Sequence, residues 1–421
     1  MRVRLLRYDL SAMATLHPFR ALRPNADNAA RIAAVPYDVV STDEARALAE
    51  GNPQSFLRVS RAELELPAGS DAYADAVYQR AAENFAALRK RALVEDEASV
   101  YFYRLQMGSH VQTGLAACFS LDEYDRDIIK KHERTRRDKE DDRTKHMLAL
   151  GAQTGPVFLT YRASEVIDRH AAEASTREPI IDFTAPDGVQ HTLWRVGGAE
   201  RDALVAAVER ISTLYIADGH HRAASAARAR TEMRDRKLAG TSLGDGAGAS
   251  TMLAVAFPHD QVQILSYNRT VRDLGGLSSD EFLAAVRERF EVAPGSGTPA
   301  KRGDIAMYFN GTWHTLRPRV ASDPTDPIGS LDVSVLQEGL LAPVLKIADV
   351  RTDKRIDFVG GARGTQALEQ LVDAGKAAVA FSLFPVSVAD LISVSDAGEI
   401  MPPKSTWFEP KLRDGLLIHL I

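Results

Sequence analysis

The chain has 421 residues, which at one domain per ~150 residues suggests two or three domains or one large unit with additions. Hydrophobic residues make up 45% and charged residues 26%, so a sizeable core can form, and bulk disorder, collagen and coiled coil are excluded. The net charge is -5 without a polybasic tail, so no nucleic-acid partner is expected. Cys118 is the single cysteine, which favours a reducing, cytoplasmic compartment.

The start of the chain does not resemble a signal peptide, because its arginines are not followed by an apolar segment. No apolar run approaches the ~18 residues of a membrane span, so no membrane partner is expected. Residues 1–12 are predicted to be a disordered extension ahead of an initiator at Met13. Residues 13–421 are expected to form one large α+β unit or two closely packed lobes, with a soft boundary at 294–303.

The first half of the chain mixes helix and strand signals. Ser41 and Glu44 form a capping box that predicts a short helix before Gly51. Apolar residues that recur every three or four positions from Tyr73 to Leu88 predict an amphipathic helix. Further predicted elements are a hairpin formed by 100–107 and 111–121, strands at 156–161, 189–196 and 213–217, and a helix at 200–211.

The second half continues with a predicted strand pair, 251–257 and 261–271, around Pro258-His259-Asp260. Asn310-Gly311 tolerates the positive φ angles of a type I′ turn and therefore predicts another hairpin. Because strands outnumber simple β-α alternation, the fold class is predicted to be α+β, with mixed, largely antiparallel sheets and helices. The glycine signatures of Rossmann and Walker nucleotide sites are missing.

The sharpest feature is an apolar strand that runs into Asp218-Gly219 and is followed at once by His220, His221 and Arg222 at the start of an Ala-rich helix. The backbone N–H groups of such a helix start converge on one spot, which favours a phosphate. Asp218 can cap the helix, hold Mg²⁺ or accept a proton. An Asp-capped helix with surface histidines is the structural alternative, but cationic side chains in a first turn oppose the helix dipole unless an anion binds.

Residues 122–145 carry equal numbers of acids and bases, which is typical of a self-paired, solvated helix. Within this run, His132 and Glu133 are followed by Lys139, Asp142 and Arg143, and the spacing of the last three puts them on one helical face. A carboxylate, an imidazole and two cations close together suit a metal-bound triphosphate. A purely structural, solvated face remains the alternative for most of these side chains.

Two further segments are weaker candidates. In residues 401–411, tandem prolines stiffen the chain and present Lys404, Ser405 and Thr406 as one rigid polar group, or else form a structural crossing segment. Tyr37 and Asp38 lie in a segment predicted to be extended, just before the capped helix.

Together these residues resemble a widespread prokaryotic family known as a domain of unknown function. The resemblance spans most of the chain in order. It rests on segments 16–24, 36–39, 131–143, 216–222, 265–269 and 401–411.

The Asp218–Arg222 motif is also similar to the nucleotide-phosphate motif of the ParB/sulfiredoxin-like superfamily, which includes ATP-dependent free L-serine kinases, CTP-using partition proteins and sulfiredoxins. The resemblance implies a ParB/sulfiredoxin-like nucleotide-binding element and ATP-dependent phosphoryl transfer to the hydroxyl of a small metabolite, with free L-serine as the first guess. His220 stands where sulfiredoxin carries its catalytic cysteine, so sulfinic-acid repair is disfavoured.

On this hypothesis the cofactors are ATP and Mg²⁺, and the partners are a nucleotide and a small hydroxylated metabolite. The predicted catalytic residues are Glu133, Asp218, His132 and His220. Tyr37 and Asp38 are predicted to bind the substrate, and Glu133, Asp218 and Asp142 the metal. The nucleotide is assigned to Gly219, His220, His221, Arg222, Lys139, Arg143, Lys404, Ser405 and Thr406. The alternatives are a non-catalytic, nucleotide-binding regulator of the partition-protein kind and a phosphohydrolase.

Overall fold

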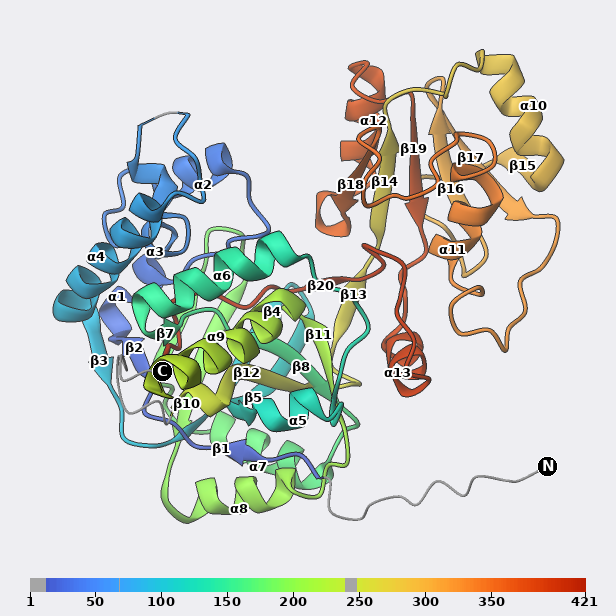
Figure 1. Ribbon diagram of the computed structural model, residues 1–421. Coiled ribbons are helices and arrows are strands. Elements are labelled where there is room, and N and C mark those ends of the chain that lie inside the picture. Colours follow the sequence, from blue (N-terminus) through green and yellow to red (C-terminus); the bar gives the residue numbers. More distant parts are fainter. Residues whose placement is uncertain (1–12, 68, 239–247) are drawn as a thin grey trace. The chain divides into compact units, whose positions relative to one another are not determined.

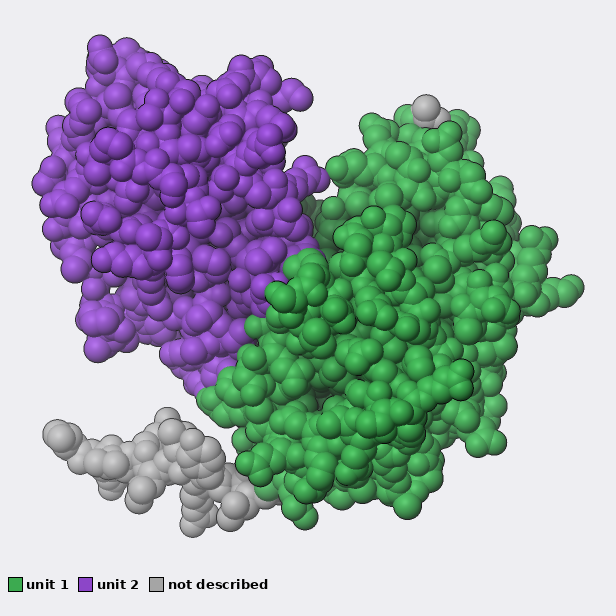
Figure 2. Space-filling model, turned by 180° about the vertical axis from the view of Figure 1, so that it is seen from behind, with its two compact units in different colours: residues 1–131, 135–262, 410–421 green, residues 132–134, 263–409 purple. Residues whose placement is uncertain are grey.

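The computed structural model describes residues 13–67, 69–238 and 248–421, and the chain forms two compact units (Figure 2). Unit 1 comprises the described residues up to 131 together with 135–262 and 410–421, and unit 2 comprises 132–134 and 263–409. The extension predicted for residues 1–12 lies outside the described residues. The segment 294–303, predicted as a soft boundary, lies inside unit 2, where it leads from one sheet strand to another.

Unit 1 is built on a large mixed sheet (Figure 1). The strand order is β6 (Ile129–Lys130), β11 (Leu214–Asp218), β8 (Val157–Tyr161), β12 (Thr251–Pro258), β5 (His110–Ser120), β4 (Val100–Met107), β10 (Gln190–Val196) and β9 (Ile181–Thr184). Most neighbouring strands pair antiparallel, whereas β8 with β12 and β6 with β11 pair parallel. β1 (Leu16–His17) pairs with β5 beside the main path of the sheet.

Helices cover this sheet, and α6 and α9 lie side by side (Figure 1). Small strand pairs join β2 (Leu22–Pro24) to β3 (Leu93–Glu95) and β7 (Ala152–Gln153) to β21 (His419–Leu420). The helices of unit 1 are α1 (Ala26–Ile32), α2 (Thr42–Ala49), α3 (Leu57–Ser60), α4 (Asp75–Ala92), α5 (Leu121–Asp125), α6 (Arg137–Leu150), α7 (Glu165–Ser175), α8 (Gly198–Val208) and α9 (His220–Leu238).

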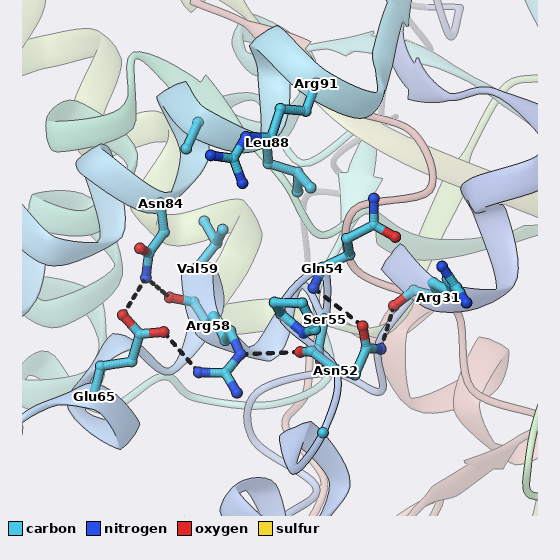
Figure 3. A pocket seen from close by; sticks show the side chains of 13 residues that line it. Arg31, Asn52, Gln54, Ser55, Arg58, Val59, Glu65, Asn84, Leu88 and Arg91 are labelled. Atoms are coloured by element: carbon cyan, nitrogen blue, oxygen red, sulfur yellow. Dashed lines mark hydrogen bonds and ion pairs between the residues drawn. The ribbon is translucent and has the colours of Figure 1, made fainter.

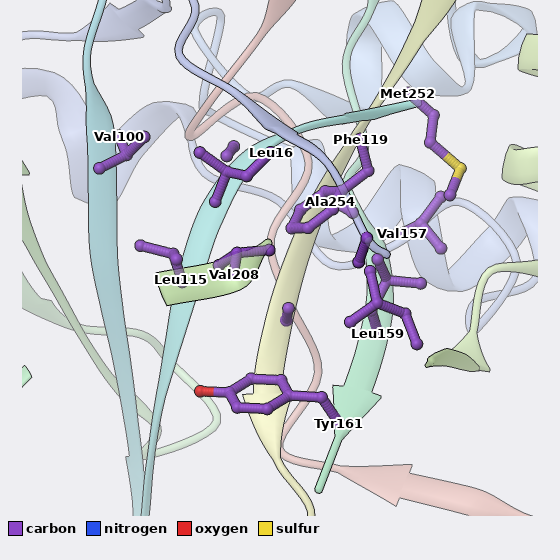
Figure 4. Close-up of a cluster of buried hydrophobic side chains, with 14 of the residues drawn as sticks. Leu16, Val100, Leu115, Phe119, Val157, Leu159, Tyr161, Val208, Met252 and Ala254 are labelled. Atoms are coloured by element: carbon purple, nitrogen blue, oxygen red, sulfur yellow. The ribbon is translucent and has the colours of Figure 1, made fainter. Parts of the chain in front are cut away.

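The core of unit 1 follows from the alternation of side chains along the central strands (Figure 4). Leu115 and Phe119 of β5, Leu159 of β8 and Met252 of β12 point into one apolar cluster, which Val208 of α8 also joins. Full burial of such a side chain contributes about 1.5–3 kcal/mol. The Ala-rich face of α9 lies against the same cluster, so the core fixes the position of the helix that follows Gly219.

Unit 2 contains an antiparallel sheet and a separate two-stranded pair, β13 (Gln263–Leu265) with β20 (Trp407–Glu409). Its helices are α10 (Ser279–Arg289), α11 (Asp332–Leu336), α12 (Gln366–Asp373) and α13 (Val388–Asp396). The sheet order is β15 (Phe290–Pro294), β17 (Thr312–Pro318), β16 (Ile305–Phe309), β19 (Val379–Leu383), β14 (Tyr267–Val271) and β18 (Ile356–Gly360).

Several local predictions are confirmed. Ser41 and Glu44 form both hydrogen bonds of the capping box at the start of α2. β4 and β5 form the predicted hairpin, and Asn310 and Gly311 turn between β16 and β17 with φ of 49° and 73°. The mixed, largely antiparallel α+β class is therefore correct.

The predicted pairing of 251–257 with 261–271 is wrong. β12 already has β5 on one side and β8 on the other, so it has no open edge for a further strand. The chain instead enters unit 2, where the second run divides into β13 and β14.

The charged run 122–145 is not one self-paired helix. The run begins in α5, Asp127 with a φ of 56° lies between α5 and β6, and the chain becomes helical again only at Arg137. Its acids also pair outside the run, because Arg228 of α9 contacts Glu140 and Arg230 contacts Asp122 at 2.9 Å. Among residues 13–67, 69–238 and 248–421, none of the helices combines the length and apolar composition of a membrane span.

Candidate functional site

The predicted strand, tight turn and helix around Gly219 are present in unit 1. β11 ends at Asp218, α9 begins at His220, and Gly219 between them has a φ of 92°, which strains any residue with a side chain. A Cβ at this position would also lie 3.1 Å from the Cζ of Arg222 and 3.4 Å from the Cα of Val157. Glycine is therefore required both by the backbone angle and by the close approach of the guanidinium group.

Asp218 is held by groups on three sides. Its Oδ1 accepts a hydrogen bond of 2.8 Å from the backbone N–H of Gly219 and lies 4.0 Å from Nη2 of Arg222. Its Oδ2 accepts one of 3.0 Å from Nζ of Lys411. Burial alone would raise the pKa of this carboxyl, but Lys411 and Arg222 outweigh it and hold the pKa well below its usual range. Asp218 is thus ionised at neutral pH, which suits an anchoring role better than proton acceptance.

Arg222 is buried at the start of α9, with 5% of its surface exposed. One Nη donates to the carbonyl of Pro156, while Nε is buried and has no hydrogen-bond partner among the residues that the structure describes. Burial disfavours its charge, but Asp38, Asp218 and Asp414 outweigh this and raise its pKa. A buried N–H without a partner costs about 1–3 kcal/mol, which an anionic oxygen could recover.

A second guanidinium group comes from α6. Arg143 lies 4.1 Å from the ring centroid of Tyr37, and its Nη1 donates to the carbonyl of Ser60 at 3.2 Å. Its Nε donates to Oδ2 of Asp142 at 2.8 Å, and Oδ1 of Asp142 accepts from the hydroxyl of Tyr78 at 3.0 Å. Both oxygens of Asp142 are therefore engaged, which favours a structural role over the predicted role as a metal ligand.

Tyr37 and Asp38 lie in a turn and not in the extended segment that was predicted. The N–H of Val39 bonds back to the carbonyl of Pro36 at 3.2 Å, and Arg61 donates to the carbonyl of Tyr37 at 2.9 Å. Burial and the nearby Asp38 raise the pKa of Tyr37, so its hydroxyl stays neutral. Asp38 is exposed, but its carboxylate is close enough to Arg222 to raise the pKa of that guanidinium group.

The other unit 1 residues predicted to bind the nucleotide have varied surroundings. Lys139 donates to the hydroxyl of Tyr73 at 2.8 Å. The Nε2 of His221 accepts a hydrogen bond of 3.0 Å from the backbone N–H of Arg136, which ties the start of α9 to the residue before α6. His220, the first residue of α9, is 4% exposed. Their roles at a phosphate stay predictions.

Asp414 is a buried member of this site that the sequence analysis missed. Its backbone forms two hydrogen bonds with that of Ala34, at 2.9 and 3.1 Å, and its side chain lies so close to Gly155 that no Cβ fits there. Its Oδ1 has no hydrogen-bond partner in the described part of the chain. Burial is the main cause that raises the pKa of Asp414 to about 7, and Asp38 adds to it while Arg222 opposes it. The Asp218 cluster is defined here as Tyr37, Asp38, Arg143, Asp218, Gly219, Arg222, Lys411 and Asp414.

Unit 2 brings together three other segments on which the resemblance rests. The N–H of Met401 donates to the carbonyl of His132 at 2.8 Å, and Nη2 of the buried Arg269 donates to the carbonyl of Lys404 at 3.0 Å. Burial lowers the pKa of Arg269 to about 10. The hydroxyl of Ser405 bonds within its own turn. The predicted residues in this unit are His132, Glu133, Lys404, Ser405 and Thr406.

The sequence matches the model of a family described as a protein of unknown function (DUF1015) over residues 16–334, which confirms the resemblance to such a family. No curated protein matches the chain. Similar solved structures include a free serine kinase in complex with AMP, with 12% identity, a TM-score of 0.36 and coverage of 72% of this chain and 92% of that one.

Two further structures have comparable scores. A conserved hypothetical protein from Pyrococcus furiosus has 13% identity and a TM-score of 0.36, with 72% of this chain and 95% of that one covered. SbnI from Staphylococcus aureus, with a C-terminal truncation, has 14% identity and a TM-score of 0.39, with 72% and 87% covered.

Proposed function

The chain belongs to the DUF1015 family, and we propose that it is an ATP-dependent phosphotransferase that acts on the hydroxyl group of a small metabolite, with free L-serine as the first acceptor to test. A cytoplasmic location, favoured by the single cysteine, and a ParB/sulfiredoxin-like nucleotide element are part of the proposal.

The observation that carries the proposal is the buried, unpartnered Nε of Arg222 beside Gly219. A guanidinium group at a helix start opposes the helix dipole, and here it is also buried. A phosphate supplies the missing acceptor and accepts hydrogen bonds from the first N–H groups of α9. Arg143 is a second arginine of the same cluster, so the negative charge of a polyphosphate can be compensated.

Phosphoryl transfer needs little covalent chemistry from the protein, since positioning and charge compensation provide most of the rate. The acceptor hydroxyl oxygen forms a bond to the γ-phosphorus, the bond from that phosphorus to the β–γ bridging oxygen breaks, and the hydroxyl proton passes to a carboxylate. Mg²⁺ supplies further charge neutralisation on the phosphates, and it commonly takes one or two carboxylates from the protein.

The carboxylates of the Asp218 cluster differ in what they can do. Asp218 has Lys411 on one oxygen and Gly219 on the other, which suits neither a proton acceptor nor a metal ligand well. Asp414 has an unpartnered oxygen and a pKa of about 7, which suits a group that takes up a proton near neutral pH. Glu133 remains the base predicted from sequence, so the proposal has two testable bases.

The experiment uses the purified full chain with Mg-ATP and a mixture of hydroxylated amino acids and small alcohols, followed by ³¹P NMR. We expect a phosphomonoester signal, with phosphoserine as the first to be sought. Arg222→Ala should abolish nucleotide binding, whereas Arg228→Ala, a half-exposed arginine on the same helix, should retain it. Glu133→Gln should spare binding and reduce turnover if Glu133 is the base.

Other outcomes would contradict the proposal. Nucleotide binding without transfer to any acceptor would favour the regulatory alternative. Release of phosphate from phosphorylated metabolites would favour the phosphohydrolase. Full activity in Glu133→Gln would exclude Glu133 alone and leave Asp414 as the base. Circular dichroism of Arg222→Ala, with Arg222→Lys as a second variant, separates loss of binding from loss of folding.

A further inference from the structure

Unit 1 contains a polar pocket that shares no residue with the Asp218 cluster (Figure 3). It has a volume of about 730 Å³, within the range of pockets that hold small molecules. Its walls come from the end of α1, the segment 51–55, α3 and α4. Val59 and Leu88 provide apolar surface in the pocket, while arginine and amide side chains surround it.

The pocket carries a net positive charge. Three arginines, Arg31, Arg58 and Arg91, and one acidic residue, Glu65, line it. Arg58 is committed to structure: it lies 2.7 Å from Glu65 and donates to the carbonyl of Asn52 at 3.0 Å. Arg31 and Arg91 are exposed, and their side chains have no hydrogen bond or ion pair within the described ranges. Two uncompensated guanidinium groups at one concavity raise the local concentration of anions.

The polar frame of the pocket is fixed before any ligand arrives. Asn52 donates to the carbonyl of Arg31 at 2.8 Å and accepts from the N–H of Gln54 at 3.1 Å. Asn84 donates to the carbonyl of Arg58 at 2.7 Å. The Oε1 of Gln54 is buried and has no hydrogen-bond partner among the residues described, although nearly all such atoms in proteins have one.

We propose that this pocket is a binding site for a small organic anion. Anionic groups of the ligand, carboxylate or phosphate, pair with Arg31 and Arg91 on the two sides of the pocket, and its carbon skeleton lies against Leu88. The arginine fork suits both anionic groups, since each accepts two parallel hydrogen bonds. This site is separate from the proposed nucleotide site and does not depend on the kinase activity.

Isothermal titration of the full chain with citrate and with glycerol 3-phosphate tests the site and distinguishes carboxylate from phosphate. We expect at least one probe to bind with a Kd below about 1 mM. The double variant Arg31→Gln/Arg91→Gln should weaken binding about tenfold or more. Arg46→Gln/Arg80→Gln, which removes the same charge from exposed positions of α2 and α4, should leave it within about twofold.

Binding of neither probe would overturn the proposal, and so would equal weakening by the two double variants, because the effect would then be general electrostatics. Probe binding should persist in Arg222→Ala. If it were lost there and kept in Arg31→Gln/Arg91→Gln, the probe would occupy the Asp218 cluster and the pocket would not be the site. These binding measurements do not require phosphotransferase activity, so they test the pocket even if the chain is inactive with Mg-ATP.

Discussion

Nζ of Lys411 lies 3.0 Å from Oδ2 of Asp218, although 193 positions separate the two residues in the chain. The pair joins the end of β11 to the segment 410–421, which returns to unit 1 after unit 2. The same segment supplies Asp414, so it provides two charged groups of the Asp218 cluster.

Replacement of Lys411 by Met should destabilise unit 1, because Asp218 would lose its principal counter-charge. We expect a loss of about 2 kcal/mol, between the values for exposed and fully buried pairs. Urea unfolding at pH 7 measures it. Arg46→Met, which removes the partner of the exposed Asp43, is the control and should change stability by less than about 0.5 kcal/mol. Equal losses of stability in the two variants would mean that the Lys411–Asp218 pair contributes no more than an exposed ion pair.

The stability of Asp414→Asn, compared with that of the parent protein, should increase as the pH rises. The folded-state pKa of Asp414 is about 7 against an ordinary value of 3.8, so the folded state keeps a proton that the unfolded state releases between these pH values. The free energy of unfolding of the parent protein therefore falls by up to about 4 kcal/mol as the pH rises from the ordinary pKa of an aspartate to that of Asp414. Unfolding of variant and parent at pH 4.5 and pH 8 measures the difference. A difference that does not vary with pH would contradict the assignment.

Asp218→Asn should show the opposite sign. The pKa of Asp218 is held below its usual range, so its contribution is present above about pH 4 and is lost as the pH falls through the folded-state value. The variant should be less stable than the parent at pH 7, and the gap should narrow as the pH is lowered below 4. Denaturant unfolding at pH 7, 5 and 3.5 measures the difference in free energy of unfolding between parent and variant. A difference that grows at acid pH would contradict the prediction.

Gly219→Ala should reduce nucleotide binding more than backbone strain alone explains. The substitution strains a φ of 92° and also places a methyl group 3.1 Å from the guanidinium carbon of Arg222. Gly188→Ala is a matched control, because its φ is 80° and nothing lies within 4 Å of the added Cβ. Both should lose about 1–2 kcal/mol of stability from strain. Only Gly219→Ala should weaken Mg-ATP binding, which a thermal-shift titration measures.

Local chemistry in the sequence is sufficient for several elements. The capping box at Ser41 and Glu44, the Asn310-Gly311 turn and the junction at Gly219 each depend on residues within a few positions of one another. Such motifs satisfy nearby backbone groups and therefore form largely independently of the rest of the fold. For this reason the strand, turn and helix at the centre of the candidate site could be predicted from sequence.

The surroundings of that centre could not be predicted, because they depend on distant segments. Asp414 belongs to no motif of the sequence, and only the backbone pairing with Ala34 places it against Gly155. The division into units is equally non-local, since unit 1 is interrupted by 263–409. The hydrogen bond that Asp142 accepts from Tyr78, on another helix, likewise leaves no trace in the spacing of α6.

The interruption of unit 1 affects how the nascent chain can fold during translation. Residues up to 262 leave the ribosome roughly 7–30 s before 410–421 do, at 5–20 residues per second. During that interval β7 lacks its partner β21, and the buried Leu22 lacks its bridge to Ile418. A ribosome that stops anywhere between residues 263 and 409 therefore releases a chain with an intact Asp218–Arg222 motif and no means of completing the site around it.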